Sequence, residues 1–234
     1  EFDRIDPGRA RVTLVEGAAR VLPDYTESLS KSAKRQLEEL GVEVLTGTLV
    51  TEISEKSVTF DDGSTFPTRT VLWAAGVRAS NLMQELGSDH DSAGRVVVRP
   101  DLSLVGPPDV FVIGDAASVA SEGKPGPGVA PAAMQQGRHA AKQIAADLSG
   151  KKRTDFRYRD RGSLATIGRA RAVAQLPRLH FSGTAAWLAW LLIHVFFLIG
   201  FRNRIFVILS WAWNYMTFRR GARIITQVET DRET

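Results

Sequence analysis

Residues 10–46 alternate between strand and helix patterns, and this order restricts the fold more than any other feature. The segment 10–17 (ARVTLVEG) is a β-branched run that ends in an acid and a glycine, which is typical of a strand. Residues 24–41 place apolar side chains at helical spacing and end in Gly41, and residues 42–53 return to strand-forming composition. Strand, helix and strand at this spacing predict a βαβ unit, and therefore an α/β fold with a parallel sheet.

Further strands are expected after this unit. Residues 57–66 (SVTFDDGSTF) carry the Asp-Gly signature of a β-hairpin, with apolar residues alternating on both sides. The runs 70–76 (TVLWAAG) and 109–115 (DVFVIGD) have the composition of buried strands, and residues 95–98 add a short one. Residues 154–176 alternate enough to predict strands as well.

One of these runs ends on a charge, because residues 109–113 lead directly into Gly114, Asp115 and Ala116. Ligands bind at the carboxyl ends of parallel strands. Gly114 permits a close backbone approach, and the Asp115 carboxylate is suited to accept a hydrogen bond from a ligand hydroxyl. These residues predict a flavin site, although an Asp that caps a following turn has the same pattern.

The segment 129–150 predicts a helix rich in Ala and Gln that ends near Gly150. A helix N-terminus carries partial positive charge. If this end points at the pyrimidine edge of a flavin, it stabilises the anionic reduced form. An ordinary amphipathic helix is the alternative interpretation.

Glu16 ends the first predicted strand. In a dinucleotide-binding βαβ unit, an acid at the end of the second strand accepts hydrogen bonds from the adenine ribose hydroxyls. The glycine-rich turn that precedes such an acid by about 20 residues is not in this chain, in which 15 residues lie before Glu16. The alternative is a surface acid at a strand end.

Composition and charge narrow the classes of partner. The 234 residues include no cysteine, which excludes disulfides, thiolate metal ligands and cysteine catalysis within them. Residues 151–234 hold 15 of the 30 Lys and Arg but 5 of the 26 Asp and Glu, a net charge of +10, whereas residues 1–150 carry −6. The basic third indicates an anionic partner, either nucleic acid or lipid headgroups. No secretory signal is expected at the N-terminus.

Two apolar runs, 184–200 and 205–218, favour lipid. Neither reaches the roughly 20 apolar residues of a spanning helix, and Ser210, Asn214 and Thr217 form one polar stripe on the second. With flanking arginines, and with four tryptophans across both runs, the second run predicts a helix in the membrane interface.

Other arrangements of these runs stay open. A tilted span is the alternative for the first run, and a buried core hairpin or a dimer interface for both. Nucleic acid is disfavoured, because the aromatic residues lie among aliphatic ones rather than between Lys and Arg on a polar face.

Five segments in chain order resemble the type II NADH dehydrogenases, which are single-subunit, non-proton-pumping NADH:quinone oxidoreductases. They are VLWAAGV, VFVIGDAA, AMQQG, FRYRDRGSLATIGRARAVA and the basic, apolar C-terminus. The sequences of these segments most resemble those of actinobacterial members, and the resemblance runs from about Arg11 to Ile225. It implies FAD and NADH as cofactors, a membrane quinone as acceptor, and a location at the cytoplasmic face of the cell membrane.

The resemblance also implies a partial two-dinucleotide-binding, Rossmann-like fold of the α/β class, with a C-terminal amphipathic helical region that binds membranes. Residues 1–80 would be the C-terminal part of the NADH-binding domain, 81–150 the returning part of the FAD-binding domain, and 151–234 the membrane-anchoring region. Within the last region, residues 184–223 would contact the lipid surface. A homodimer is compatible with this organisation.

Roles for individual residues follow from the same resemblance. Glu16 would hold the adenine ribose of NADH. Ala75 and Gly76 would lie where the nicotinamide and flavin domains meet. Asp115, after Gly114, would bind the ribityl chain of FAD.

The helix that follows the flavin corner supplies the remaining positions. Ala116 would lie near the pyrophosphate of FAD, and the backbone at Ala132 and Ala133 would approach the pyrimidine edge. Gln135 and Gln136 would face the quinone side. No catalytic side chain is assigned, because the hydride step needs no acid or base from the protein.

Two departures from the family pattern matter. The family often has Ala-Gln where this chain has Ala130-Pro131, so a side-chain role is lost there. Both Gly-x-Gly-x-x-Gly turns of the family are expected upstream of Glu1, so the chain resembles the C-terminal half of the enzyme. We therefore expect that it does not hold FAD tightly by itself.

Two rival functions remain open. One is another flavoprotein reductase of the same architecture, acting on a disulfide, ferredoxin or sulfide. The lack of cysteine and the apolar C-terminus count against it. The other is a non-catalytic, membrane-associated module that keeps the fold without the cofactors.

Overall fold

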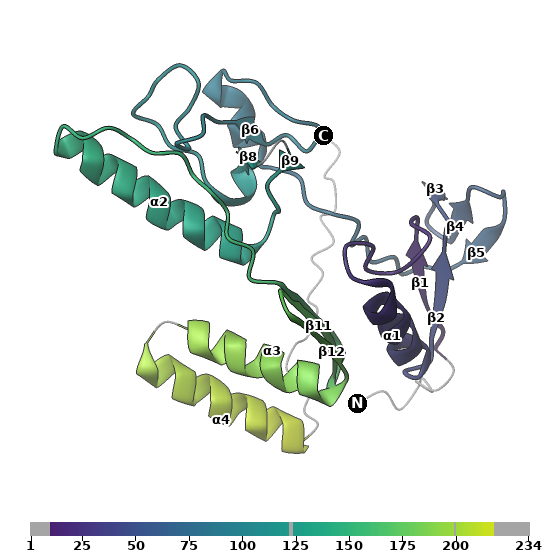
Figure 1. The fold of residues 1–234 in the computed structure, drawn as a ribbon. Coiled ribbons are helices and arrows are strands. Elements are labelled where there is room, and N and C mark those ends of the chain that lie inside the picture. The colour runs from purple at the N-terminus through teal and green to yellow at the C-terminus, as the bar shows by residue number, and fades with distance from the viewer. Residues whose placement is uncertain (1–9, 122–123, 199, 218–234) are drawn as a thin grey trace, which may run out of the picture. The chain divides into compact units, whose positions relative to one another are not determined.

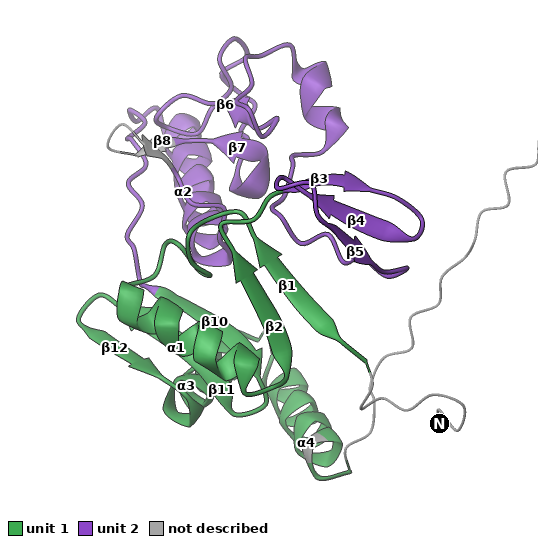
Figure 2. Cartoon of the chain, turned by 90° about the vertical axis from the view of Figure 1, so that its right-hand side faces the viewer, with its two compact units in different colours: residues 1–49, 163–234 green, residues 50–162 purple. Residues whose placement is uncertain are grey.

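A computed structural model of the chain describes residues 10–121, 124–198 and 200–217 (Figure 1). The chain divides into two compact units, which Figure 2 colours separately. Residues up to 49 join residues from 163 onward in unit 1, and residues 50–162 form unit 2.

Both units contain helices and strands. Unit 1 contains β1 (Val12–Glu16), α1 (Glu27–Glu38), β2 (Val42–Thr46), β10 (Ser163–Gly168), β11 (Arg171–Leu176), β12 (Leu179–Ser182), α3 (Thr184–Phe197) and α4 (Phe201–Thr217). Unit 2 contains β3 (Val50–Ile53), β4 (Ser57–Phe60), β5 (Thr65–Pro67), the short helix η2 (Asn81–Leu86), β6 (Val96–Val97), the turn η3 (Gly114–Ala116), β7 (Ala117–Ser118), β8 (Ala120–Ser121), β9 (Lys124–Pro125) and α2 (Ala130–Leu148).

The βαβ unit expected from the sequence is confirmed. β1 pairs with β2 in parallel, with Val12 opposite Val42, and α1 connects them. Leu29 and Ala33 on α1 are buried, which is the apolar face that the helical spacing predicts. Gly41 ends the helix region at φ +84°.

A three-stranded antiparallel sheet, β10–β11–β12, lies between two helices of unit 1. Side chains alternate along β11: Val173 packs with α1, whereas Ala172 and Ala174 pack with Ala186 of α3. Because successive side chains of a strand point to opposite faces, α1 and α3 cover opposite faces of this sheet. The small residues on the second face let α3 approach closely.

The β10–β11 hairpin turns through Arg169 and Ala170, and Ala170 adopts φ +57°. That conformation costs an L residue roughly 1–2 kcal/mol, which glycine avoids. We expect Ala170→Gly to raise the free energy of unfolding by about 0.5–1 kcal/mol, measured by urea denaturation. Ala165→Gly, in the middle of β10, is the control and should lower it by a similar amount. Equal destabilisation by both changes would contradict this account.

The hairpin predicted at residues 57–66 is also confirmed. β4 pairs with β5 in antiparallel fashion, and β3 adds a third strand. Gly63 takes φ +80° in the connecting turn, and Asp62 Oδ1 accepts a hydrogen bond of 2.8 Å from the backbone N–H of Ser64. The Asp-Gly pair therefore makes the turn for the reason that the sequence suggested.

The core of unit 2 is built around short strand pairs rather than a long sheet. β6 and β7 pair in parallel over two residues each. One apolar cluster fills the space around them and consists of Val96, Val98, Leu102, Leu104, Val112, Ala117, Val119 and Phe156. Ala116 of the turn η3 packs against this cluster, and Ala117, which follows the turn directly, belongs to it.

Arg153 fastens the end of α2 to a loop of the same core. Its guanidinium donates to Asp147 Oδ2 at 2.6 Å, to Asp101 Oδ2 at 3.1 Å and to the carbonyl of Pro108 at 2.9 Å. The hydrogen bond from Arg153 lowers the pKa of the Asp147 carboxyl below its usual range. The chain that leaves α2 is thereby held against the unit.

The expectation of a buried strand at 70–76 is wrong for this structure. The segment forms no strand in the described ranges, and Leu72 and Trp73 are 85% and 66% exposed. A buried strand of this composition needs neighbouring strands on both edges and cover on both faces. The described part of unit 2 places no strand beside it.

The run at 109–113 differs from its expectation as well. It makes one isolated bridge, between Phe111 and Ser103, instead of a continuous strand. Val112 is buried in the core of unit 2 while its neighbours are partly exposed, so the apolar run packs on one side only. Residues 154–162 likewise form no strand, and the predicted strands begin at Ser163.

The two C-terminal apolar runs are both helical, as expected. α3 and α4 run side by side in Figure 1, and α4 begins at Phe201 rather than at residue 205. Arg204 lies inside α4, where it donates to the carbonyl of Leu198 and stacks over Phe196. Within the described residues, neither helix has the length and apolar character that crossing a membrane requires.

Candidate cofactor site

The turn η3 is the centre of the candidate site in unit 2. Ile113 is extended at φ −139°, and Gly114 then adopts φ +69°, a left-handed conformation that L side chains rarely take. A Cβ on Gly114 would stand 3.5 Å from the Cβ of Ala133 on α2. Glycine is therefore favoured at this position by its left-handed backbone, while the space beside α2 would admit a Cβ.

Gln136 of α2 fixes this turn from inside the unit. Its side chain is 5% exposed, and Oε1 accepts a hydrogen bond of 2.6 Å from the backbone N–H of Gly114. The sequence suggested a position on the quinone side for Gln136. The structure gives its amide a defined structural partner that spacing alone did not reveal.

Replacement of Gln136 tests this contact. We expect Gln136→Leu to lower the free energy of unfolding by about 1–3 kcal/mol, because the Gly114 N–H loses its acceptor in a partly buried place. The exposed Lys142→Leu on the same helix is the control and should change stability by less than about 0.5 kcal/mol. Thermal and urea unfolding measure both, and a neutral Gln136→Leu would show that the bond contributes nothing.

The Asp115 carboxylate is open to ligands. Its side chain is exposed, and the described residues supply it with no hydrogen-bond donor and no ion pair. Oδ1 stands 3.7 Å from the point that a Cβ on Gly128 would occupy, which is an ordinary van der Waals distance. An unpaired carboxylate beside two glycines fits a ligand hydroxyl that approaches closely.

The start of α2 faces the same turn. Val129 precedes the helix without a side-chain cap, and Pro131 occupies its first turn. Ala132 is 2% exposed, and the N–H groups of Ala132 and Ala133 both bond to the carbonyl of Val129. Their contribution to a bound anion is therefore the positive end of the helix dipole and a lack of side-chain bulk, rather than free donors.

Three polar residues of α2 bind the segment that follows the helix, and of these the sequence had suggested only Gln135 as a site residue. Gln135 accepts from the N–H of Arg159 and donates to its carbonyl, both at 3.0 Å. His139 and Gln143 both bond to Thr154. The spacing of four between these α2 residues was the available signal, since it places them on one helix face.

Glu16 ends β1 in unit 1, as expected. Its Oε1 accepts a hydrogen bond of 2.8 Å from the N–H of Ala18, which tightens the turn after the strand. Oε2 has no partner among the described residues. The side chain is thus both a turn cap and an acceptor with one free oxygen, which fits a ribose hydroxyl.

Ala75 and Gly76 are both exposed and lie in an irregular segment of unit 2. Gly76 has φ +96°, which a residue with a side chain would adopt only with strain. Ala75 and Gly76 have no described contact that assigns them a ligand.

Five of the predicted site residues do lie together in the structure: Gly114, Asp115, Ala116, Ala133 and Gln136.

Comparison with known proteins identifies families whose sequences match this chain. Residues 6–137 match the pyridine nucleotide-disulphide oxidoreductase family, and residues 161–220 match the NDH2 C-terminal domain. The type II NADH:quinone oxidoreductase Ndh of Mycobacterium tuberculosis is 42% identical over 236 residues, which cover 96% of this chain and 50% of that protein. A type II NADH:quinone oxidoreductase of Staphylococcus haemolyticus is 40% identical over 169 residues, covering 70% and 42%.

A solved structure agrees at the level of the fold. The structure of NDH2 from Plasmodium falciparum in complex with NADH superposes with a TM-score of 0.80 at 16% identity, over 91% of this chain and 59% of that chain.

The chain belongs to the pyridine nucleotide-disulphide oxidoreductase family. Within that family, its C-terminal domain and its relatives place it with the type II NADH dehydrogenases, and it spans about half the length of the curated relatives it matches. The resemblance inferred from the sequence and the partial two-dinucleotide-binding α/β fold are thereby confirmed.

Proposed function

We propose that the chain provides the C-terminal portion of a flavin-dependent NADH:quinone oxidoreductase. The observation that carries this proposal is the unpaired Asp115 carboxylate, held on a glycine turn against the start of α2 in a chain of this family. The relatives are named for NADH and quinone, and we extend both substrates to this chain. In this proposal residues 1–80 belong to the NADH-binding domain, residues 81–150 belong to the FAD-binding domain, and residues 151–234 anchor the protein to the membrane.

The residues at the turn have separate tasks in binding. FAD, when bound, supplies the redox chemistry, by accepting a hydride from NADH and passing two electrons to a quinone. Asp115 accepts a hydrogen bond from a ribityl hydroxyl, and Gly114 leaves room for it. The start of α2 stabilises negative charge next to Ala133. Gln136 keeps the Gly114 N–H engaged, so that the turn stays in place.

Glu16, Gln135 and Gln136 have tasks of their own in this proposal. The free Oε2 of Glu16 accepts from an adenine ribose hydroxyl of NADH, while Oε1 holds the turn. The amides of Gln135 and Gln136 bind backbone within unit 2. We infer that their part on the quinone side is to keep Arg159 and Gly114 in position.

We also propose that α3 and α4 attach the protein to the cytoplasmic face of the cell membrane. Along α4, the half-buried positions include the polar Ser210 and Asn214, whereas Phe206 and Leu209 are 73% and 64% exposed. This is the reverse of a helix that faces water. An apolar face turned outward fits the boundary between lipid headgroups and acyl chains, with Arg202 at its start.

NADH oxidation with a short-chain quinone tests the proposed activity. The assay compares this chain with the same chain extended at its N-terminus to the length of its relatives, each with added FAD. We expect quinone-dependent oxidation from the extended protein and little from the chain alone. If the extended protein is folded and still inactive, the non-catalytic module is the better description. If it reduces a disulfide or a ferredoxin instead of quinone, the rival reductase is.

A further inference from the structure

Arg153 joins the two elements of unit 2 that form the cofactor corner. Besides its bonds to Asp147, Asp101 and the carbonyl of Pro108, its guanidinium carbon lies 4.9 Å from the centre of the Phe111 ring. Asp147 belongs to α2, whereas the other three partners belong to the segment that leads to the turn η3. A guanidinium that donates to three acceptors and also stacks on an aromatic ring is held in one orientation, and it holds its partners in turn.

The run 109–113, which carries the turn η3, takes its position from residues 102–104. The Val112 N–H donates to the carbonyl of Leu102 at 3.2 Å, and the Leu104 N–H donates to the carbonyl of Val110 at 2.8 Å. These two bonds and one isolated bridge take the place of a continuous strand pairing. A shift of residues 102–104 would therefore shift the run, and with it the Asp115 carboxylate.

The chain is strained just where residues 102–104 begin. Leu102 is fully buried and adopts φ +74°, a left-handed conformation that L side chains rarely take. Such a conformation persists where the surrounding structure holds it. Asp101 provides one support: Oδ1 accepts hydrogen bonds from the backbone N–H and the hydroxyl of Ser103 at 3.0 and 2.7 Å, while Oδ2 accepts from Arg153 at 3.1 Å.

We propose that Arg153 is a positioning residue for the cofactor corner. It holds Asp101 and Phe111, and through them the run that sets where the Asp115 carboxylate meets a hydroxyl of FAD. Its bond to Asp147 ties the same run to α2, whose start faces the turn η3. This inference rests on the proposed role of Asp115 and adds to the site a residue that acts through others.

A double-mutant cycle between Arg153 and Asp115 tests this role. FAD is titrated into the apoprotein of the chain extended to the length of its relatives, as the wild type, Arg153→Gln, Asp115→Ala and the double variant. We expect Arg153→Gln alone to weaken FAD binding by about tenfold. In the presence of Asp115→Ala the same change should cost less than about threefold, because the hydrogen bond that depends on position is already lost.

An equal factor in both backgrounds overturns the proposal. A residue that only stabilises the fold would weaken FAD binding to the same extent whether or not the Asp115 carboxylate is present.

Asp101→Asn tests the same link with a smaller change of shape, and it serves where Arg153→Gln does not fold. The amide of asparagine carries no negative charge and places either its oxygen or its N–H groups, but not two acceptors, between Ser103 and Arg153. We expect the loss of FAD affinity from Asp101→Asn to shrink in the presence of Asp115→Ala, as it does for Arg153→Gln. Full additivity of Asp101→Asn and Asp115→Ala overturns the inference.

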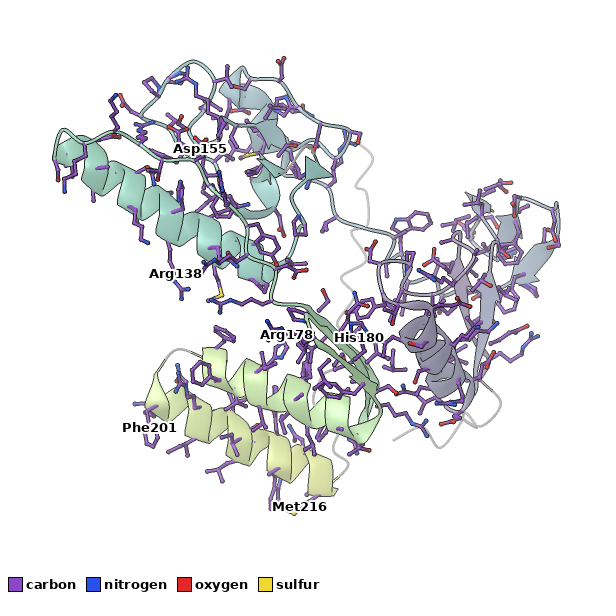
Figure 3. All side chains as sticks on the ribbon, viewed as in Figure 1. Arg138, Asp155, Arg178, His180, Phe201 and Met216 are labelled. Carbon is purple, nitrogen blue, oxygen red and sulfur yellow. The ribbon has the colours of Figure 1, made fainter. Side chains whose placement is uncertain are left out.

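Two neighbouring residues provide matched controls. Lys152 is exposed and directly precedes Arg153, and Asp155, which Figure 3 labels, is an exposed carboxylate on the same segment. We expect Lys152→Gln and Asp155→Asn to leave the dissociation constant of FAD within about twofold of the wild type. Losses equal to those of Arg153→Gln and Asp101→Asn would reduce the effect to general charge and overturn the positioning role.

This inference and the proposed function fail in different ways. If the extended wild-type protein binds no FAD, the proposed function fails, and the role of Arg153 fails with it. If the wild type binds FAD and Asp115→Ala weakens binding while Arg153→Gln and Asp101→Asn do not, the proposed function stands and the positioning role alone is wrong.

Discussion

Replacement of Asp115 by alanine is expected to weaken FAD binding by about 10- to 100-fold in the chain extended to the length of its relatives. The reason is the loss of one hydrogen bond between a charged acceptor and a ligand hydroxyl, which contributes about 1.5–3 kcal/mol. Titration of the apoprotein with FAD, followed by flavin fluorescence, measures the dissociation constant.

Asp109→Ala is the matched control for this experiment. Asp109 is an exposed aspartate a few residues before the turn, and it has the same charge. We expect its replacement to leave the dissociation constant within about twofold of the wild type. If Asp115→Ala also binds FAD normally, the carboxylate has no part in the site and Asp115 is a simple surface residue.

Replacement of Phe206 by aspartate is expected to weaken vesicle binding by roughly 100-fold. Phe206 is 73% exposed on α4, so the change should not disturb packing. The change removes the favourable free energy of burying a large apolar side chain away from water, about 1.5–3 kcal/mol. It also adds one negative charge, which anionic lipid repels. Flotation with vesicles that contain an anionic lipid measures the partition coefficient.

Asn203→Asp is the control for the added charge. It places the same charge on α4 without removing apolar surface, and we expect a loss of only about fivefold. Figure 3 labels Phe201 and Met216 near the two ends of the same helix. These two residues are 76% and 72% exposed. Equal losses for Phe206→Asp and Asn203→Asp would mean that binding is purely electrostatic and that the apolar face is not inserted.

Local patterns predicted the elements whose form depends on their own residues. The helical spacing of Leu29 and Ala33 sufficed for α1, and the Asp-Gly pair sufficed for the β4–β5 turn. The start of α2 beside Gly114 was anticipated because the order of segments resembles a known family.

Features that depend on distant partners were not predictable in the same way. The run around Trp73 has strand composition, but strand formation needs a neighbour that pairs with it. The hydrogen bond of Gln136 to Gly114 joins residues 22 positions apart, and periodicity does not reveal which buried amide finds which N–H. The bond of Arg153 to Asp101 joins residues 52 positions apart, and the local pattern around either residue does not indicate it.

Anaerobic mixing of the extended, FAD-loaded protein tests the central claim most directly. NADH is added first, then a short-chain quinone, and the flavin absorbance is followed through both steps. The account predicts that NADH bleaches the flavin and that quinone restores its absorbance, whereas a disulfide or a ferredoxin does not. A flavin that NADH reduces but that quinone leaves reduced would contradict the proposed function.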